Sequence, residues 1–383
     1  MNLVKFASEQ MSIIEKFAKF DSKVRKNLHF LPPHLFVNLY SNGRKEFLYH
    51  LSKNFPKSQI VINPDYNVKL WDIDFNIPLF NSAGMFKTGE GYELVQRQGA
   101  GAYLSGTTTA GHRVGNIKDG IHHPFVPLSE SKAAINWMGL PNPGHADIAN
   151  KLAKINKIKG CPIGASISSD NGDDELQNLQ GVVLGFKLYD KANVDFIELN
   201  ESCPNVKHVN GEVDSSGLDK HLIERLEYVS KNYLSHRLRN LPVIVKFSND
   251  TDINLIPKLI DLLIDLGFNG INFGNTSTAY QQKRKFIKPK ELNLYDYFTN
   301  TFGGGLSGNL LKDDSLKLCS QAISYLNTKI LEDEFHIIRT GGIENHSDII
   351  AGLNKGIKLN QWFTGYFEAF SNEGHNLYRN IFR

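Results

Sequence analysis

From about residue 66 onward, short apolar runs alternate with longer stretches of helical periodicity, and this alternation constrains the fold more than any other feature. It is typical of βα units and a parallel sheet. We expect strands at residues 79–83, 102–106, 162–167, 194–200, 242–247, 270–274, 336–340 and 360–364. The helical pattern between them is clearest at 219–235 and 253–266. Because crossovers between parallel strands are right-handed, eight such units predict an α/β fold, a (β/α)8 TIM barrel.

The first sixty residues differ from the rest in charge. They hold ten Lys and Arg residues against four Asp and Glu residues, whereas the whole chain has a formal net charge of +3. Apolar residues recur at helical spacing on both sides of Pro32-Pro33, which predicts two helices, the second open to interruption by a turn at 41–43. We therefore expect a basic amphipathic helical extension at 1–60 and a barrel domain at 61–383. The extension is either a hairpin packed on the barrel or a patch that rests on an anionic membrane.

Charge and cysteine usage argue against several classes of protein. The small net charge gives no reason to expect nucleic acid as a partner. Cys161, Cys203 and Cys319 lie far apart with no CxxC pair, so we expect no disulfide framework, no iron–sulfur cluster and no metal site. No apolar run approaches ~20 residues and no signal-peptide pattern precedes the fold, so we expect no membrane-spanning segment.

Polar residues collect at the carboxyl ends of the expected strands, where a barrel of this kind carries its chemistry. The stretch 200–205 holds two amides, a hydroxyl and a thiol, and the fifth strand ends near Lys246. Gly341-Gly342 and Gly365 follow the seventh and eighth strands, which suits a phosphate site, although such glycines are also common helix caps. The loop expected at 275–312 is long enough to be a functional lid.

Nine motifs, in this order along the chain, resemble those of the dihydroorotate dehydrogenases, FMN-dependent enzymes of pyrimidine synthesis. The matching stretches are residues 81–90, 106–109, 136–142, 200–205, 245–248, 274–277, 304–308, 340–343 and 363–365. The resemblance implies oxidation of dihydroorotate to orotate in de novo UMP biosynthesis. In that reaction a base removes a proton from C5 of the substrate, and a hydride from C6 passes to N5 of FMN.

The resemblance also implies a role for individual residues. Cys203 stands at the position of the catalytic base; a free thiol has a pKa near ~8.5, so its surroundings must ionise it or it must relay its proton at high pH. The substrate-binding residues implied are Lys87, Asn136, Met138, Gly139, Leu140, Asn200, Asn205, Asn275 and Thr276. The cofactor-binding residues implied are Ala83, Gly84, Lys87, Thr107, Ser166, Asn200, Lys246, Gly274, Ser307, Gly308, Gly341, Gly342, Phe363, Thr364 and Gly365. Lys246 would lie by the N1/O2 edge of the flavin, where reduction builds negative charge.

Plainer interpretations stay open at this point. Cys203 could be a buried structural cysteine, the role that we expect for Cys161 and Cys319. Lys87 and Lys246 could be solvated residues at strand ends.

The residues that indicate the electron acceptor divide between two classes of the family. The family divides into a soluble class with a cysteine base and a quinone-using, membrane-associated class with a serine base and an N-terminal helical extension. Cys203 resembles the first class. The extension, Lys87 and Gly106, where soluble members usually carry lysine, resemble the second; Ser166 replaces an asparagine usual in the quinone class. We give the extension, Lys87 and Gly106 more weight than Cys203. We therefore expect a quinone acceptor and a peripheral location on the cytoplasmic side of the inner membrane.

Four alternatives remain. Two are cytoplasmic dihydroorotate dehydrogenases: one reduces fumarate, and the other reaches NAD through a partner subunit with FAD and an iron–sulfur cluster. The third is an activity on uracil or thymine like that of a dihydropyrimidine dehydrogenase. The fourth is a flavin- or phosphate-binding barrel without catalysis.

Overall fold

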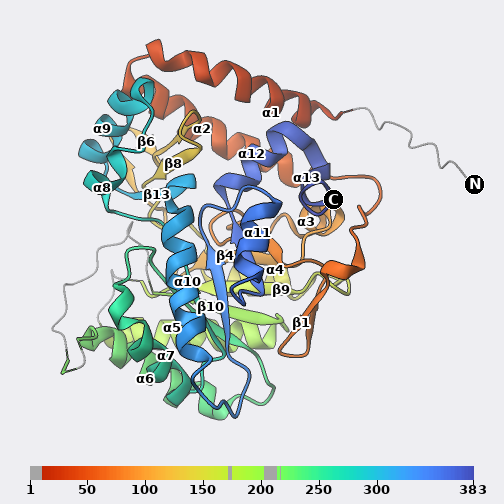
Figure 1. Cartoon of the computed structure of the whole chain (residues 1–383), viewed down its shortest axis with the longest axis vertical. Helices are drawn as coiled ribbons and strands as arrows, with labels where there is room; N and C mark the ends of the chain where they lie inside the picture. The colour runs from red at the N-terminus through yellow and green to blue at the C-terminus, as the bar shows by residue number, and fades with distance from the viewer. Residues whose placement is uncertain (1–10, 171–174, 202–213, 216) are drawn as a thin grey trace, which may run out of the picture.

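The structure, a computed structural model, describes residues 11–170, 175–201, 214–215 and 217–383. At its centre lies an eight-stranded parallel sheet with the order β3-β15-β14-β12-β11-β10-β9-β4. Its strands are β3 (Leu79–Asn81), β4 (Tyr103–Thr108), β9 (Ile163–Ile167), β10 (Phe196–Asn200), β11 (Val243–Phe247), β12 (Gly270–Phe273), β14 (His336–Thr340) and β15 (Leu359–Trp362). All eight expected strands are confirmed, and so is the (β/α)8 barrel (Figure 1).

A side chain helps to close the barrel between its first two strands, β3 and β4. Asn81 is fully buried; its Nδ2 donates a hydrogen bond to the Leu104 carbonyl at 2.7 Å, and its Oδ1 accepts one from the Leu104 N–H at 3.2 Å. Just beyond β3, Phe86 forms a parallel bridge with Ser105. The side-chain amide of Asn81 therefore makes the hydrogen bonds to β4 that backbone groups would make in a regular sheet, at the point where the short β3 ends.

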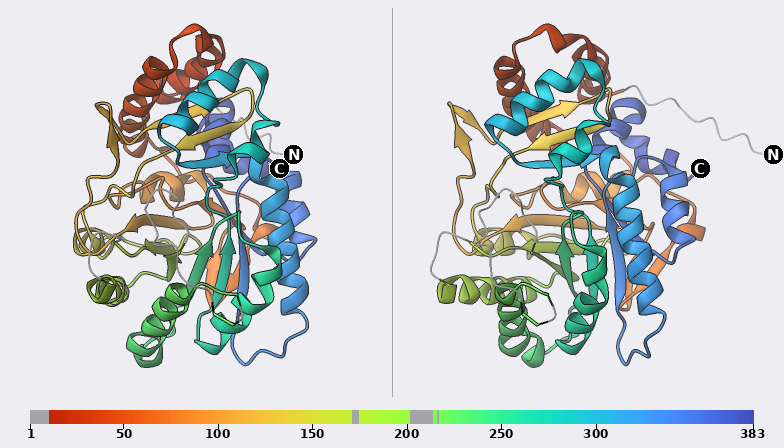
Figure 2. Two further views of the ribbon diagram at one scale, coloured as in Figure 1. Left: turned by 90° about the vertical axis from the view of Figure 1, so that its left-hand side faces the viewer. Right: turned by 60° about the vertical axis from the view of Figure 1, so that its left-hand side comes forward.

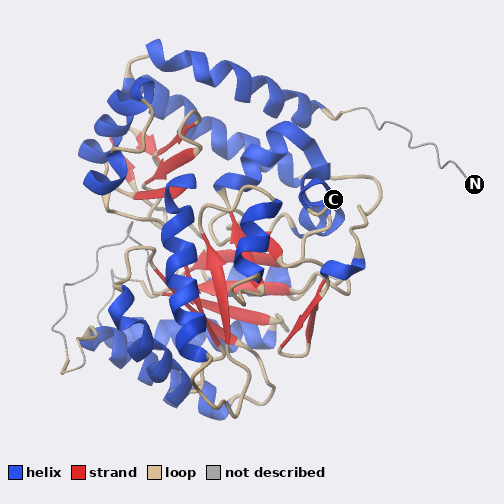
Figure 3. Ribbon diagram, in the orientation of Figure 1, coloured by secondary structure: helices blue, strands red, loops and turns tan. Residues whose placement is uncertain are grey.

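Helices surround the strands, as the views in Figures 2 and 3 show. They are α3 (Tyr92–Gln98), α4 (His145–Leu152), α5 (Glu175–Lys191), α6 (Lys220–Asn232), α7 (Ile256–Asp265), α10 (Lys312–Leu326), α11 (His346–Leu353), α12 (Thr364–Glu373) and α13 (Leu377–Ile381). Helix α7 shows why they pack on the sheet: it buries Ile256, Leu259, Ile260 and Leu263, which lie on one face at helical spacing. The hairpin β1 (Val68–Leu70) and β2 (Ile73–Phe75) precedes the barrel.

A second, antiparallel sheet forms from two segments far apart in the sequence. It has the order β13-β8-β7, with β7 (Phe125–Leu128), β8 (Ala133–Asn136) and β13 (Gly305–Gly308), and the short hairpin β5 (Ile117–Lys118) and β6 (Ile121–His122) precedes it. The expectation of a long loop at 275–312 is wrong, because this segment contains α8 (Tyr280–Arg284), α9 (Leu292–Thr301) and β13. Leu294, Phe298 and Leu306 bury their side chains there beside Phe36 and Val37 of the extension.

The two predicted helices of the extension are confirmed as α1 (Ile13–Val24) and α2 (Pro33–Ser52). They lie side by side across one end of the molecule, where α1 packs on α12 and α2 on β7 (Figures 1 and 2). The expected turn at 41–43 is wrong, since α2 continues through it. Ser41 is buried, donates to the Val37 carbonyl at 2.6 Å and accepts from the Phe125 N–H at 3.0 Å, so the hydroxyl is satisfied without a break in the helix. Within the described residues, no helix combines the length and apolar character needed to cross a membrane.

Candidate active site

A cavity opens at the carboxyl ends of the barrel strands and contains about 930 Å³ of space between protein atoms, open solvent included. Seven of the eight barrel strands and β8 and β13 supply its walls, directly or through the residues that follow them. Its lining includes nearly all the described residues that the resemblance implied: Ala83, Gly84, Lys87, Thr107, Asn136, Met138, Leu140, Asn200, Lys246, Gly274, Asn275, Thr276, Ser307, Gly308, Gly341, Gly342, Phe363, Thr364 and Gly365.

Two expected residues do not line the cavity. Ser166 is fully buried behind Thr107, with the two hydroxyl oxygens 2.9 Å apart, and its short side chain ends there. Gly139 has φ +69°, and a Cβ at this position would meet Asn116 rather than the cavity. The structure thus places both residues behind the cavity wall, and their assignments to flavin and substrate stay predictions. Cys203 and Asn205 lie outside the described residues.

The lining also includes residues that the sequence did not single out: Ser82, Leu311, Thr340, Ile343 and Trp362. Ser82, Thr340 and Ile343 belong to the matched motifs, so their position at strand ends could have identified them. Trp362 ends β15 and Leu311 lies just before α10. The indole N–H of Trp362 donates to the Tyr378 hydroxyl, and Leu311 has no polar group, so neither residue had a feature that would have drawn attention to it.

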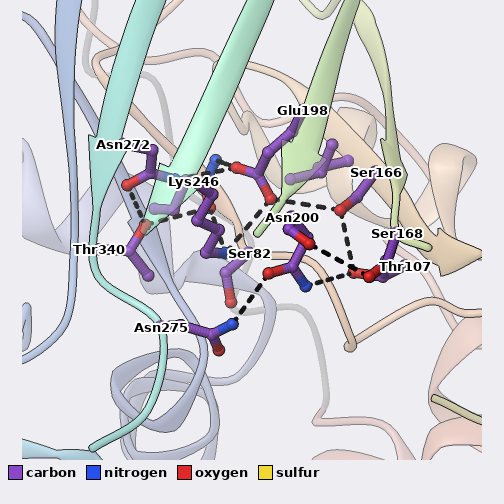
Figure 4. Close-up of polar contacts among 12 residues, drawn as sticks. Ser82, Thr107, Ser166, Ser168, Glu198, Asn200, Lys246, Asn272, Asn275 and Thr340 are labelled. Carbon is purple, nitrogen blue, oxygen red and sulfur yellow. Dashed lines mark hydrogen bonds and ion pairs between the residues drawn. The ribbon is translucent and has the colours of Figure 1, made fainter. Parts of the chain in front are cut away.

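Lys246 belongs to a buried polar layer across the barrel (Figure 4). Its side chain is only 3% exposed, and its Nζ lies 3.3 Å from Oε1 of Glu198, whose side chain is 1% exposed. Oε2 of Glu198 accepts hydrogen bonds from Nδ2 of Asn272 at 2.9 Å and from Nε2 of Gln361 at 2.7 Å. The interpretation of Lys246 as a solvated strand-end lysine is therefore wrong. Buried charges of opposite sign are stabilised here by each other and by hydrogen bonds.

The amides form a chain along the other wall of the cavity. Nδ2 of Asn275 donates to Oδ1 of Asn200 at 3.1 Å, and Nδ2 of Asn200 donates to Oγ1 of Thr107 at 3.2 Å (Figure 4). Oγ1 of Thr276 is buried and has no hydrogen-bond partner among the described residues. Since buried hydroxyl groups are normally hydrogen-bonded, Thr276 indicates a place where a ligand completes the wall. Across the cavity, the half-buried Lys87 donates to Sδ of Met138 at 3.2 Å.

The glycines after β14 and β15 line the cavity, and Gly365 lies in the first turn of α12. Helix α12 begins at Thr364 without a side-chain cap, and its first N–H groups have no partner within the helix. The positive end of the helix dipole adds to their attraction for a dianion. The alternative role of Gly341-Gly342 as a cap of α11 does not hold, because Asn345 caps that helix. A Cβ on Gly342 would lie 2.3 Å from Cα of Lys312, so this close approach requires glycine.

The sequence profile of the dihydroorotate dehydrogenase family matches residues 66–375. The chain belongs to the dihydroorotate dehydrogenase family. It is accordingly an oxidoreductase. Its helical extension precedes the matched region.

Relatives of both acceptor classes resemble this dihydroorotate dehydrogenase family member. The dihydroorotate dehydrogenase (quinone) of Idiomarina loihiensis is 26% identical over 328 residues, which cover 85% of this chain and 88% of the relative. The catalytic subunit of dihydroorotate dehydrogenase B (NAD(+)) of Fusobacterium nucleatum is 29% identical over 294 residues, covering 76% and 83%. The crystal structure of DHODH in complex with ferulenol from Eimeria tenella has a TM-score of 0.72 at 20% identity, over 94% of this chain and 92% of its own, which shows a shared fold.

Proposed function

We propose that the chain oxidises dihydroorotate to orotate with FMN as the hydride acceptor, in de novo pyrimidine biosynthesis. The observation that carries the proposal is the cavity at the barrel mouth, where a buried lysine, a chain of amides and a helix N-terminus beside glycines come together. The substrate loses a proton from C5 and a hydride from C6, a loss of two electrons that leaves the double bond of orotate.

The residues present fit FMN. Gly341, Gly342 and the first turn of α12 offer backbone N–H groups for its phosphate, and Ser307 and Thr364, whose hydroxyl oxygens lie 2.9 Å apart, stand beside them. Ala83, Gly84, Thr107 and Lys246 supply a wall for the ring system. When bound, FMN supplies N5 as the acceptor of the hydride.

The polar side chains can bind and orient a planar pyrimidine. Asn136, Asn200 and Asn275 each offer a donor and an acceptor to the ring amides and carboxylate, and Thr276 offers the unpaired hydroxyl. Lys87 places a positive charge near the substrate carboxylate. Cys203 follows Asn200 by three residues, and we assign it the removal of the C5 proton on the strength of the family resemblance; Asn205 joins the substrate amides on the same ground.

Anaerobic flavin spectroscopy tests this proposal. The purified protein is expected to be yellow with the absorbance of FMN, and dihydroorotate is expected to bleach it. Dihydrouracil, which lacks the carboxylate, serves as the control and should leave the colour unchanged. Bleaching by dihydrouracil alone would favour the uracil or thymine activity, and flavin that neither compound reduces would favour a binding protein.

We propose a quinone as the second electron acceptor, reached through the extension at residues 1–60 on the cytoplasmic side of the inner membrane. Helix α1 exposes Ile13, Phe17 and Phe20 at helical spacing, and α2 exposes Leu35 and Leu39. Four exposed lysines of α1 and its continuation, Lys16, Lys19, Lys23 and Lys26, accompany this apolar surface. An apolar strip with lysines beside it suits a peripheral contact with anionic lipid.

The soluble alternative draws support from the cysteine at position 203 and from the NAD-linked Fusobacterium relative. Parallel steady-state assays with a short-chain ubiquinone, fumarate and NAD distinguish the acceptors. Turnover with ubiquinone alone is expected. Turnover with fumarate alone would leave the extension as a packing element.

A further inference from the structure

Glu198 has no role in the reaction described above, although it is among the most deeply buried carboxylates of the barrel. Its side chain is 1% exposed and does not line the cavity. It points from β10 into the polar layer, where Figure 4 shows it between Lys246 and Ser166. Burial of an ionised carboxylate is costly unless its oxygens are satisfied, so its surroundings need an explanation.

Every described contact of this carboxylate comes from a group that can donate a hydrogen bond. Oε2 accepts from Asn272 and Gln361, and Oε1 lies 3.4 Å from the Ser166 hydroxyl and 3.3 Å from the Lys246 amine. The oxygens of the two amides face other donors. Oε1 of Gln361 lies 3.4 Å from the Lys246 amine, and the single hydroxyl proton of Thr340 can be donated to one of the two amide oxygens at a time. Oγ1 of Thr340 lies 3.0 Å from Oδ1 of Asn272 and 3.1 Å from Oε1 of Gln361.

Lys246 is the link between this carboxylate and the cavity. The lysine lines the cavity and Glu198 does not, so the carboxylate acts on a bound ligand through the lysine and its field. We propose that Glu198 is a positioning residue that neutralises Lys246 and thereby lowers the reduction potential of the bound flavin. This inference rests on the proposed FMN site.

Electrostatics gives the direction of this change in the reduction potential. A flavin gains negative charge on reduction, and a cation beside it stabilises the reduced form. The carboxylate opposes that effect because charges within the barrel interior are screened far less than charges in water. The buried pair is therefore close to neutral, which keeps the reduced flavin a better electron donor to the second acceptor.

The measurement is the midpoint potential of bound FMN, by anaerobic spectrophotometric titration without substrate. Glu198→Gln keeps the size and one acceptor oxygen but removes the charge. We expect its reduced flavin to be favoured at least about tenfold over that of the native protein, an upward shift of about 30 mV for a two-electron couple. Glu198→Asp, which keeps the charge, should stay near the native potential.

Glu201→Gln is the matched control. Glu201 is also a buried carboxylate, with a side chain 3% exposed, and it forms an ion pair with Arg225 at 2.7 Å, but it does not line the cavity. The same substitution there should cost stability without a change in the flavin potential. If Glu198→Gln lowers the melting temperature and leaves the potential at its native value, Glu198 is a structural residue and the proposal is wrong.

Lys246 supplies a second test that does not depend on the single Glu198 variant. Lys246→Gln should lower the potential, and Glu198→Gln/Lys246→Gln, which removes both charges, should return it toward the native value even if Glu198→Gln alone loses flavin. A double variant with a potential as low as that of Lys246→Gln would overturn the proposal. A native protein without flavin absorbance would instead overturn the proposed function as well.

Discussion

Single residues around the cavity are held to their identity by backbone geometry. Gly106 of β4 has φ +102°, and a Cβ there would lie 2.6 Å from the Ser166 carbonyl oxygen of the neighbouring strand β9. A side chain at position 106 is excluded by both the conformation and the space. The lysine that soluble members of the family usually carry at this position thus cannot enter this barrel without a local rearrangement.

We expect Gly106→Ala to destabilise the protein by about 2–5 kcal/mol, since a left-handed conformation costs a non-glycine residue about 1–2 kcal/mol and overpacking adds about 1–3 kcal/mol. Urea denaturation measures the loss. Gly111→Ala is the control: no atom lies within 4 Å of a Cβ built there, and its φ is not in the left-handed region. Equal stability of the two variants would show that the β4 backbone adjusts to a side chain.

The base assigned to position 203 has its own test. Cys203→Ala should retain FMN and slow the reduction of flavin by dihydroorotate by about 10²–10⁴-fold, the usual contribution of a general base. Anaerobic stopped-flow absorbance at saturating dihydroorotate gives the rate. Cys161→Ala, at a fully buried cysteine outside the cavity, controls for loss of a thiol in the barrel. An unchanged rate in Cys203→Ala would remove that residue from its assigned role.

At the scale of elements, a buried polar cluster joins β4 to α4 and α5 outside the barrel. Oγ1 of Thr108 lies 2.8 Å from Nδ1 of His145 and 2.7 Å from the Tyr189 hydroxyl. Burial lowers the pKa of His145 to about 3. Between pH values of about 3 and 6.5 the imidazole is therefore neutral in the folded protein, whereas in the unfolded chain it binds a proton.

This difference makes stability depend on pH. Between the unfolded pKa of about 6.5 and the folded pKa of about 3, the unfolded state binds the extra proton, so the free energy of unfolding falls as the pH falls. From pH 7 to pH 5 the loss due to His145 should be about 2 kcal/mol. His145→Gln should remove that part of the loss, as urea denaturation at the two pH values would show. A variant with the pH dependence of the native protein would mean that the imidazole becomes protonated inside the fold.

At the scale of the whole molecule, the extension is part of the folded body as well as a proposed membrane contact. Phe36 and Val37 of α2 are buried with residues of β7, β8 and α9, and Glu15 of α1 accepts a hydrogen bond from the His375 N–H at 2.9 Å. Deleting residues 1–60 would therefore expose apolar core. If the protein still folds, the deletion should spare dye-linked oxidation more than quinone reduction.

Substitutions on the exposed face separate membrane contact from packing. Phe17 and Phe20 are 55% and 64% exposed. Phe17→Glu/Phe20→Glu should weaken binding to vesicles with anionic lipid at least about tenfold, because each buried aromatic side chain contributes roughly 1.5–3 kcal/mol. Dye-linked oxidation should be unchanged. Vesicle sedimentation measures the binding, with Leu238→Glu as the control at a fully exposed leucine outside the extension. Equal binding of all three proteins would argue against a membrane contact through α1.

Sequence alone determined the barrel and the end at which its site lies. Apolar runs of strand length mark β4, β9 and β11, and parallel strands place their carboxyl ends at one edge, so Asn200 and Lys246 had to be neighbours of the site. The pairing of β13 with β8 was not predictable, because its partners are about 170 residues apart and neither strand has a strong pattern of its own. The ion pair between Glu198 and Lys246 also depended on tertiary structure. Glu198 pairs in register with Ile244 on β11, which puts Lys246 two residues further on the same face, whereas a slip by one residue would turn the two charges to opposite faces.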